Sequence, residues 1–201
     1  LAEEGARGIG ADVDLIRTGS LYHDVGKLHA PDWFIENQKD GPNPHDALDD
    51  PQASAAVLQA HVDEGLKLAR RHRLPRPIAD FIPEHQGTLK MGYFLHKAQE
   101  RGGAVEERRF RYRGPVPRSK ETAILMLADG CEAALRSLPP DTSDAQAVDT
   151  VRRIVEARQR DGQLRKSSLN RSEVELVIRA FVQVWRRMRH RRIPYPIPAR
   201  R

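Results

Sequence analysis

Apolar residues recur at helical spacing along most of this 201-residue chain, and this periodicity limits the folds available to it. The pattern predicts long helices over residues 12–23, 53–72, 119–138, 146–160 and 172–189, and shorter ones over 76–84 and 88–100. Strand-like alternation is almost absent. Residues 108–117 are the one candidate for extended chain, and their prolines and Gly114 favour a loop or a short hairpin. The sequence therefore predicts an all-α fold.

Length and composition fit a single helical bundle. A chain of this length can bury one proper core or two small ones, and no internal repeat divides it. Aromatic residues make up only 5%, so Leu, Val, Ile and Ala should form the core. The polar segment 36–51 is expected to be a long loop, and such loops in compact domains are often functional. We predict one domain over residues 1–201, with a single cysteine, Cys131, and thus no intramolecular disulfide.

The net charge of +6 favours anionic partners such as nucleotides, nucleic acid or a membrane surface. The densest basic cluster is "WRRMRHRR", residues 185–192, within a basic C-terminal tail over 185–201. This cluster is either a nucleic-acid site or a solvated helix end whose cations complement the helix dipole, and we favour the second. No apolar stretch approaches the length of a membrane span, and no signal peptide is visible. The start at Leu1 without Met reads as a cut from a longer protein.

Five histidine and aspartate residues could carry chemistry. In "SLYHDVGKLHAP", residues 20–31, His23 and Asp24 end an apolar run and Lys27 follows closely. His61 lies in an apolar stripe, where a hydrogen-bonded core histidine is the more ordinary interpretation. His85 follows "DFIPE" and taken alone could be an ordinary surface histidine. Asp129 lies among apolar neighbours in "LMLADGCEAAL", and a buried carboxylate requires a metal, an arginine or a helix N-terminus.

Together these residues favour a metal site. They sit on or at the ends of separate helices, and several helices directing His and Asp inward is how bundles build metal centres. Imidazole and carboxylate ligands without thiolate suit Fe, Mn, Zn or Mg rather than a structural zinc. An Asp beside a His can bridge two metals, and a two-metal site suits phosphodiester hydrolysis. Lys27, one helical turn from His23, could neutralise a phosphate oxygen.

The order His-Asp, His, His and then Asp in a late helix resembles the HD-domain superfamily of metal-dependent phosphohydrolases. Longer stretches resemble the cytoplasmic domain of seven-transmembrane HD receptors, the PgpH-type cyclic di-AMP phosphodiesterases. These stretches include "YHDVGKLHAPDWFIENQ", "HVDEGLKLARRHRLPRPIADFIPEHQGT" and "RFRYRGPVPRSKETAILMLADGCEAALRSL". The resemblance covers nearly the whole chain, from about residue 1 to about residue 195.

The resemblance implies an all-helical HD-type catalytic domain that hydrolyses cyclic di-AMP to 5′-pApA with two divalent metal ions, iron or manganese. It implies a cytoplasmic domain anchored to a bacterial inner or plasma membrane by upstream helices, with no specific nucleic-acid partner, and it is compatible with a homodimer. Asp24 would bridge the metals and Lys27 would be a phosphate neighbour. The implied metal ligands are His23, Asp24, His61, His85 and Asp129, and the residues near the nucleotide are Asn43, His45, Asp46 and Thr88. His45 could equally be a simple loop histidine.

Two departures from the family pattern affect the expected activity. The family's first ligand is a histidine upstream of the segment that matches "LAEEGARGIG", and this chain begins after that point. Gln86 stands where the family usually has a second histidine, and an amide oxygen is a poorer ligand than imidazole for Fe or Zn. Gln86 is therefore only a weak candidate for a metal or substrate contact.

Three other interpretations remain open. The domain could bind a cyclic dinucleotide as a signalling module whose catalysis Gln86 has impaired. It could be an HD phosphohydrolase for a different nucleotide. A purely structural helical domain is the third, but it leaves Asp129 and the inward histidines unexplained.

Overall fold

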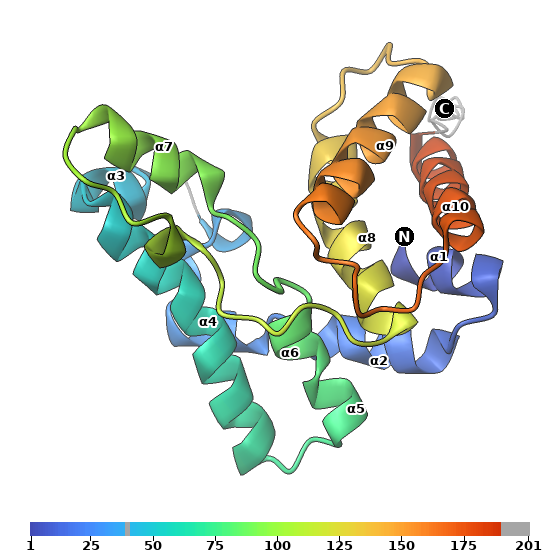
Figure 1. Ribbon diagram of the computed structural model, residues 1–201, viewed down its shortest axis with the longest axis horizontal. Helices are drawn as coiled ribbons and strands as arrows, with labels where there is room; N and C mark the ends of the chain where they lie inside the picture. Colours follow the sequence, from blue (N-terminus) through green and yellow to red (C-terminus); the bar gives the residue numbers. More distant parts are fainter. Residues whose placement is uncertain (39–40, 190–201) are drawn as a thin grey trace, which may run out of the picture.

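The computed structural model describes residues 1–38 and 41–189, and these residues form α-helices joined by short 3₁₀ turns and loops (Figure 1). The one β-type pairing in these ranges is an isolated bridge between Lys90 and Arg111. The all-α prediction is therefore confirmed. The α-helices are α1 (Ala2–Ile9), α2 (Val13–Tyr22), α3 (Pro44–Leu48), α4 (Pro51–Arg71), α5 (Arg76–Ala79), α6 (Phe81–Glu84), α7 (Gly92–Glu100), α8 (Lys120–Arg136), α9 (Asp144–Arg160) and α10 (Arg171–Arg189). The 3₁₀ turns are η1 (Val25–His29), η2 (Pro31–Trp33), η3 (Ile35–Asn37) and η4 (Glu107–Phe110).

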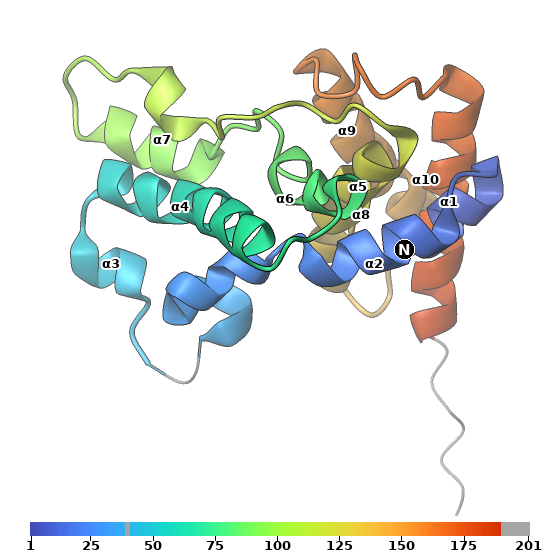
Figure 2. The same ribbon diagram turned by 90° about the horizontal axis from the view of Figure 1, so that it is seen from below.

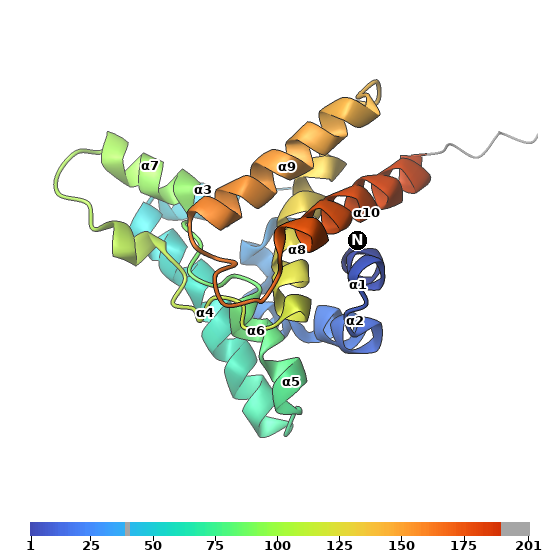
Figure 3. The same cartoon turned by 45° about the vertical axis from the view of Figure 1, so that its right-hand side comes forward.

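The larger apolar core lies among α1, α2, α8, α9 and α10, which gather on one side of the molecule (Figures 1 and 3). Helix α8 is central to this group, because nearly all of its first half is buried. Its start is fixed by a capping box in which the Ser119 and Thr122 side chains satisfy backbone donors at the helix N-terminus. Gly5 in α1 lets the Phe181 ring of α10 approach, since a Cβ there would lie 2.8 Å from the ring. The core also includes Ile16, Phe81, Ile124, Leu127, Val151, Val177 and Trp185.

A second, smaller apolar cluster joins α4, α7 and η4 on the other side, where α3 also packs (Figure 2). Its buried members are Ala55, Met91, Phe94, Leu95 and Phe110. The 21-residue α4 is the long element of this side, and Asp50 caps its N-terminus by accepting hydrogen bonds from two backbone amides. The loop after α2, with η1, packs against α4, so this loop connects the two clusters.

The predicted helix over 76–84 is two short helices, α5 and α6, separated at Asp80. Pro83 explains the break, because it has no N–H to donate to the carbonyl of Ala79. Glu84 then anchors α6 to the start of α8. Its buried carboxylate accepts hydrogen bonds from Arg118 N at 2.8 Å, Arg118 Nε at 2.6 Å and Thr122 Oγ1 at 2.7 Å.

Two other segments differ from their predicted structures. The helix expected over 88–100 begins only at Gly92, because residues 89–91 pair with 110–112 instead. Met91 N donates to Phe110 O and Tyr112 N donates to Leu89 O, which makes residues 108–117 a paired loop rather than a full hairpin. The predicted polar loop over 36–51 contains the five-residue helix α3.

The basic cluster at the end of α10 is paired within the molecule as far as residue 189. Arg186 lies 2.5 Å from Asp144, Arg187 lies 3.1 Å from Glu4, and Arg189 stacks on the Trp185 ring. This pairing agrees with a solvated helix end. The rest of the predicted basic tail, 190–201, lies outside the described residues. In the part of the chain that is described, no helix has the length and apolar character needed to cross a membrane.

Candidate metal centre

The loop after α2 brings Asp24 and Lys27 to α4 because Gly26 allows an unusually close approach. A Cβ on Gly26 would lie 1.7 Å from the carbonyl oxygen of His61 and 2.5 Å from Gly65 N. Gly65 in turn faces Gly26 and Ile82, with no side chain to hold the segments apart. Two glycines thus set η1 directly on the middle of α4, at the turn that carries His61.

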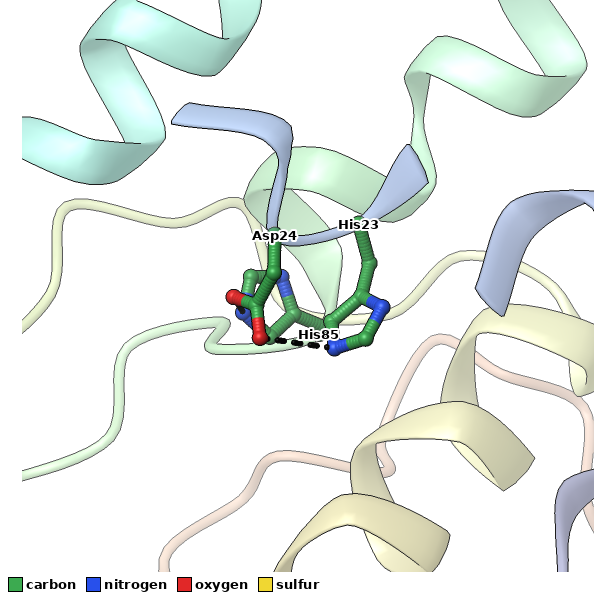
Figure 4. A group of neighbouring side chains, drawn as sticks. All are labelled: His23, Asp24 and His85. Atoms are coloured by element: carbon green, nitrogen blue, oxygen red, sulfur yellow. Dashed lines mark ion pairs between the residues drawn. The ribbon is translucent and has the colours of Figure 1, made fainter. Parts of the chain in front are cut away.

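His23, Asp24 and His85 form one compact group, with one ligand atom from each lying within 4.8 Å of the others (Figure 4). His23 Nε2 lies 3.1 Å from Asp24 Oδ2, and His85 Nε2 lies 3.4 Å from Asp24 Oδ1. His61 joins the group from α4, with its Nε2 3.6 Å from Asp24 Oδ1 and 3.4 Å from His85 Nε2. Residues from three separate helical segments therefore converge on one carboxylate.

Each of the three histidines is oriented by the same local hydrogen bond. The Nδ1 atom of His23 pairs with Ser20 O at 2.8 Å, that of His61 with Leu58 O, and that of His85 with Ile82 O at 2.7 Å. A carbonyl oxygen only accepts, so Nδ1 carries a proton in each ring. In a neutral imidazole this leaves the lone pair on Nε2, the atom that faces Asp24. Such backbone partners are how proteins fix the tautomer and the direction of metal-binding histidines.

The residues of this group fit a metal ion. Among the described residues, Asp24 Oδ1 is a buried oxygen that accepts no hydrogen bond, and two imidazole nitrogens face it at 3.4 and 3.6 Å. An anionic oxygen without a donor is costly to bury unless a cation satisfies it. Two or three imidazoles with one carboxylate and no thiolate suit iron, manganese or zinc in a catalytic rather than a structural site.

The electrostatics of the group keep the carboxylate charged and one ring neutral. Burial raises the pKa of Asp24, but the close His23 and His85 rings outweigh it, so that pKa lies well below its ordinary value. Burial and the nearby His85 lower the pKa of His61 to about 4. Burial also lowers the pKa of His23, but the close contact with Asp24 and the charges of Asp24 and Asp129 raise it overall. At neutral pH His61 can therefore offer a lone pair to a cation.

Lys27 extends the charged group towards the loop that follows. Its Nζ lies 2.8 Å from Asp24 Oδ2 and also pairs with Glu36 of η3, and it lies 5.1 Å from the centre of the Phe34 ring. Burial lowers the pKa of Lys27, but the charges and hydrogen bonds of Asp24 and Glu36 raise it above its ordinary value. Lys27 is thus a fixed cation beside the candidate metal ligands. Glu36 is a member of this group that the sequence did not single out.

Asp129 does not occupy the buried position that the sequence suggested, and that expectation was wrong. The side chain is exposed on α8, on the same face as the exposed Ala133 and Arg136, while the buried stripe of α8 runs through Ala128, Cys131 and Leu135. It belongs to no compact ligand group in the described residues. Burial and the charge of Asp24 raise the pKa of Tyr112, the tyrosine whose ring lies 5.9 Å from that of His61, and the charge of Asp129 adds to this effect and to the raised pKa of His23. Asp129 therefore lies near enough to influence these groups through its charge.

The predicted nucleotide contacts of the segment "NPHD" have local partners. Asn43 caps α3 by accepting a hydrogen bond from His45 N at 3.0 Å. The His45 ring packs against Trp33 and Phe94, and its Nε2 lies 3.0 Å from Trp33 O. Asp46 is exposed and lies 3.3 Å from Lys97. His45 Nδ1 is buried without a hydrogen-bond partner in the described ranges, so a ligand contact at this ring remains a prediction.

Gln86 and Thr88 lie on the turn that follows His85, and both are half-buried. Gln86 has a backbone role, since its carbonyl accepts from Leu89 N at 3.0 Å. Thr88 is held by Gln163, a fully buried residue from the segment after α9. The sequence pattern alone did not indicate a role for Gln163 or Glu84. The placement of Glu84 directly before His85 in an apolar run was the available signal for a buried, paired carboxylate.

Comparison with known proteins gives a family and several close relatives. Residues 1–134 match the family described as HD domain. The cyclic-di-AMP phosphodiesterases PgpH of Bacillus subtilis (strain 168) and Listeria monocytogenes serotype 1/2a (strain 10403S) are 36% and 37% identical over 196 residues, which cover 98% of this chain and 27% of each relative. Uncharacterized protein slr0104 of Synechocystis is 50% identical over 201 residues, 98% of this chain and 25% of that protein. The chain thus spans about a quarter of the length of these relatives.

Two solved structures share the fold. The crystal structure of the L. monocytogenes PgpH HD domain in complex with cyclic-di-AMP superposes with a TM-score of 0.88 at 35% identity, over 93% of this chain and 86% of that one. A second crystal structure of the same HD domain gives a TM-score of 0.87 at 35% identity, over 94% and 88% of the two chains.

Proposed function

The chain belongs to the HD domain family of metal-dependent phosphohydrolases, and on that premise we propose that it is the catalytic domain of a phosphodiesterase that hydrolyses cyclic di-AMP to 5′-pApA. The likeness to the PgpH proteins supports the substrate class, since a PgpH HD domain has been crystallised with cyclic-di-AMP. By the same likeness the domain would be the cytoplasmic part of a bacterial membrane protein.

One observation carries the proposal. Three histidines from different segments direct Nε2 to a single buried carboxylate, and each is fixed through Nδ1 by a backbone carbonyl. A histidine that only packs in a core has no need of a shared anion whose Oδ1 lacks a donor within the described residues. The arrangement therefore supports metal binding over a purely structural role.

We propose that the site holds two divalent ions, iron or manganese, with His23, Asp24, His61, His85 and Asp129 as ligands and Asp24 shared between them. Such ions lower the pKa of a water and polarise a phosphoryl oxygen. Lys27 would offer its ammonium to a phosphate oxygen beside Asp24. Hydrolysis adds the oxygen of water to phosphorus, breaks the bond from phosphorus to one 3′ oxygen and leaves a proton on that oxygen. Asn43, His45, Asp46 and Thr88 would contact the nucleotide.

The decisive experiment is turnover of cyclic di-AMP by the 201-residue chain and by the full-length protein, with Mn²⁺ or Fe²⁺ added. Cyclic di-GMP is the control substrate, and the products are separated by chromatography. Conversion of cyclic di-AMP to pApA is the expected result. Cleavage of another nucleotide in its place would assign a different substrate. A protein that carries metal and leaves every nucleotide intact contradicts the enzymatic proposal.

Gln86→His separates an impaired enzyme from a nucleotide sensor. Gln86 follows a candidate ligand directly and is half-buried, so an imidazole at this position could add a ligand. If the wild-type protein binds cyclic di-AMP without cleaving it, turnover gained by Gln86→His identifies an impaired active site. Tight binding without turnover in both proteins identifies a sensor.

A further inference from the structure

Gln163 is a fully buried glutamine whose amide is entirely committed to Thr88 and Asp161. Its side-chain exposure is 0%. Gln163 Oε1 accepts from Thr88 N at 3.0 Å, and Gln163 Nε2 donates to Thr88 Oγ1 at 2.9 Å and to Asp161 Oδ2 at 2.8 Å. Gln163 and Thr88 are 75 residues apart in sequence, so this contact joins the end of α9 to the turn after His85.

Arg111 and Gly87 also keep the turn after His85 in place. Arg111 donates to Thr88 O at 3.0 Å and pairs with both carboxylate oxygens of Asp161, at 3.2 and 3.1 Å. Gly87 has a φ of +52°, and a Cβ there would lie 2.5 Å from Gln163 Oε1, so only glycine fits against the glutamine. The backbone N–H, the carbonyl and the hydroxyl oxygen of Thr88 therefore all have partners, three residues after the candidate ligand His85.

The hydrogen bond from Gln163 determines whether the Thr88 hydroxyl accepts or donates in this contact. A hydroxyl has one proton to donate, and a glutamine NH₂ only donates. Because Nε2 of Gln163 donates to Thr88 Oγ1, the Thr88 proton is not used in this contact. Within the described residues that proton has no acceptor, and Thr88 is only half-buried. The hydroxyl can thus donate to a ligand.

A glutamate at position 163 would reverse this polarity with almost no change of shape. The backbone bond from Thr88 N to the side-chain oxygen would persist. The second carboxylate oxygen would replace the NH₂ group that donates to Thr88 Oγ1, and it would accept the Thr88 proton instead. This oxygen would also face the negatively charged Asp161. The amide form is therefore the one that leaves the Thr88 proton available.

We propose that Gln163 is a positioning residue that presents the Thr88 hydroxyl as a hydrogen-bond donor to an acceptor oxygen or nitrogen of the bound cyclic dinucleotide, an inference that rests on the proposed function. Arg111 and Asp161 hold this pair in register with the turn that carries His85. Gln163 acts through Thr88 and does not itself touch the nucleotide.

The test is a double-mutant cycle on the full-length protein with cyclic di-AMP and Mn²⁺, measuring kcat, KM, bound metal and thermal stability. Thr88→Val keeps the shape and the backbone bond to Gln163 but removes the hydroxyl, and Gln163→Glu redirects its proton. Each is expected to raise KM about tenfold with unchanged metal content, because one hydrogen bond to the ligand is lost. The double variant is expected to match the single variants, because both changes remove the same bond.

Two further variants are controls. Thr88→Ser keeps the hydroxyl and is expected to retain a KM near that of the wild type. Gln146→Glu makes the same chemical change on α9 in a capping box, where the side-chain oxygen only accepts from Ser143, and is expected to leave KM unchanged.

Several outcomes overturn the inference. They are an unchanged KM in Thr88→Val, equal loss in Thr88→Ser and Thr88→Val, or a Gln163→Glu effect that persists fully in the Thr88→Val background. If Gln163→Glu fails to fold, the comparison of Thr88→Val with Thr88→Ser still decides whether the hydroxyl donates. A wild-type protein that neither binds nor cleaves cyclic di-AMP refutes the proposed function, and this inference falls with it. Wild-type turnover with insensitive variants refutes this inference alone.

Discussion

At the scale of single residues, the candidate site is defined by where protons sit on three imidazoles. Each histidine donates from Nδ1 to a carbonyl three residues earlier in the chain, and this bond is local to its own helix end. Because Nδ1 makes the local hydrogen bond, the Nε2 atom of each ring is left to face the same carboxylate. Asp24 is the residue on which they converge, so it should matter more to metal binding than any one histidine.

Asp24→Asn is expected to weaken Mn²⁺ binding by more than about 100-fold, because the variant loses the one anionic carboxylate that the imidazoles share. Metal content after dialysis at fixed free Mn²⁺ measures the effect. Asp14→Asn, at an exposed acid on α2 that pairs with Arg17, is the matched control and should bind Mn²⁺ like the wild type. Equal Mn²⁺ content in both variants would remove Asp24 from the site.

At the scale of elements, close packing of η1 on α4 and of α6 on α8 sets the positions of the ligands. Gly26 and Gly65 admit the first contact, and the buried carboxylate of Glu84 secures the second. Neither contact involves a ligand atom. Both decide where His61 and His85 stand relative to Asp24.

Gly26→Ala is expected to lower both stability and turnover. The new methyl group would overlap the His61 carbonyl, so η1 must move away from α4, at a cost of about 1–3 kcal/mol in the free energy of unfolding. Urea unfolding and cyclic di-AMP turnover measure the two effects. Gly8→Ala is the control, because no atom lies within 4 Å of its Cβ position in α1, and alanine there should stabilise the helix slightly. A Gly26→Ala protein as stable and active as the wild type would contradict the packing described.

Glu84→Gln is expected to destabilise the protein by about 1–3 kcal/mol, because both carboxylate oxygens of Glu84 accept hydrogen bonds, whereas an amide would place a donating NH₂ group against the donors of Arg118 or Thr122. The urea midpoint measures the loss. Glu64→Gln removes only an exposed pair with Lys67 and should leave the midpoint unchanged. Identical midpoints in the two variants would show that Glu84 does not anchor α6.

At the scale of the whole molecule, the candidate site lies between the two apolar clusters. Its three histidines come from α2, α4 and α6 or their ends, and these helices contribute to different clusters. A metal held there would bind across the fold and stabilise the native state as a unit. That residues 1–201 form one domain remains a prediction.

Mn²⁺ is accordingly expected to raise the thermal midpoint of the wild-type chain by several degrees. Saturation at 100 times the dissociation constant adds about 2.7 kcal/mol to the stability of the native state. Thermal unfolding with and without Mn²⁺ measures the shift, a chelator should reverse it, and Asp24→Asn should not show it. A shift of the same size in Asp24→Asn would mean that Mn²⁺ binds elsewhere.

The sequence by itself determined the helical class, most of the long helices and the residues that make up the histidine–aspartate group. These follow from short-range patterns, since apolar spacing and a His-Asp pair are visible within a few residues. The sequence pattern predicted one helix over 76–84, and the break at Asp80, which Pro83 explains, was not predicted. Only the tertiary structure decided that the Asp129 side chain is exposed. It also decided that residues 89–91 pair with 110–112 and that Gln163 forms hydrogen bonds with Thr88. Such contacts join residues far apart in the chain, and no local pattern specifies which distant partner will satisfy a buried polar group.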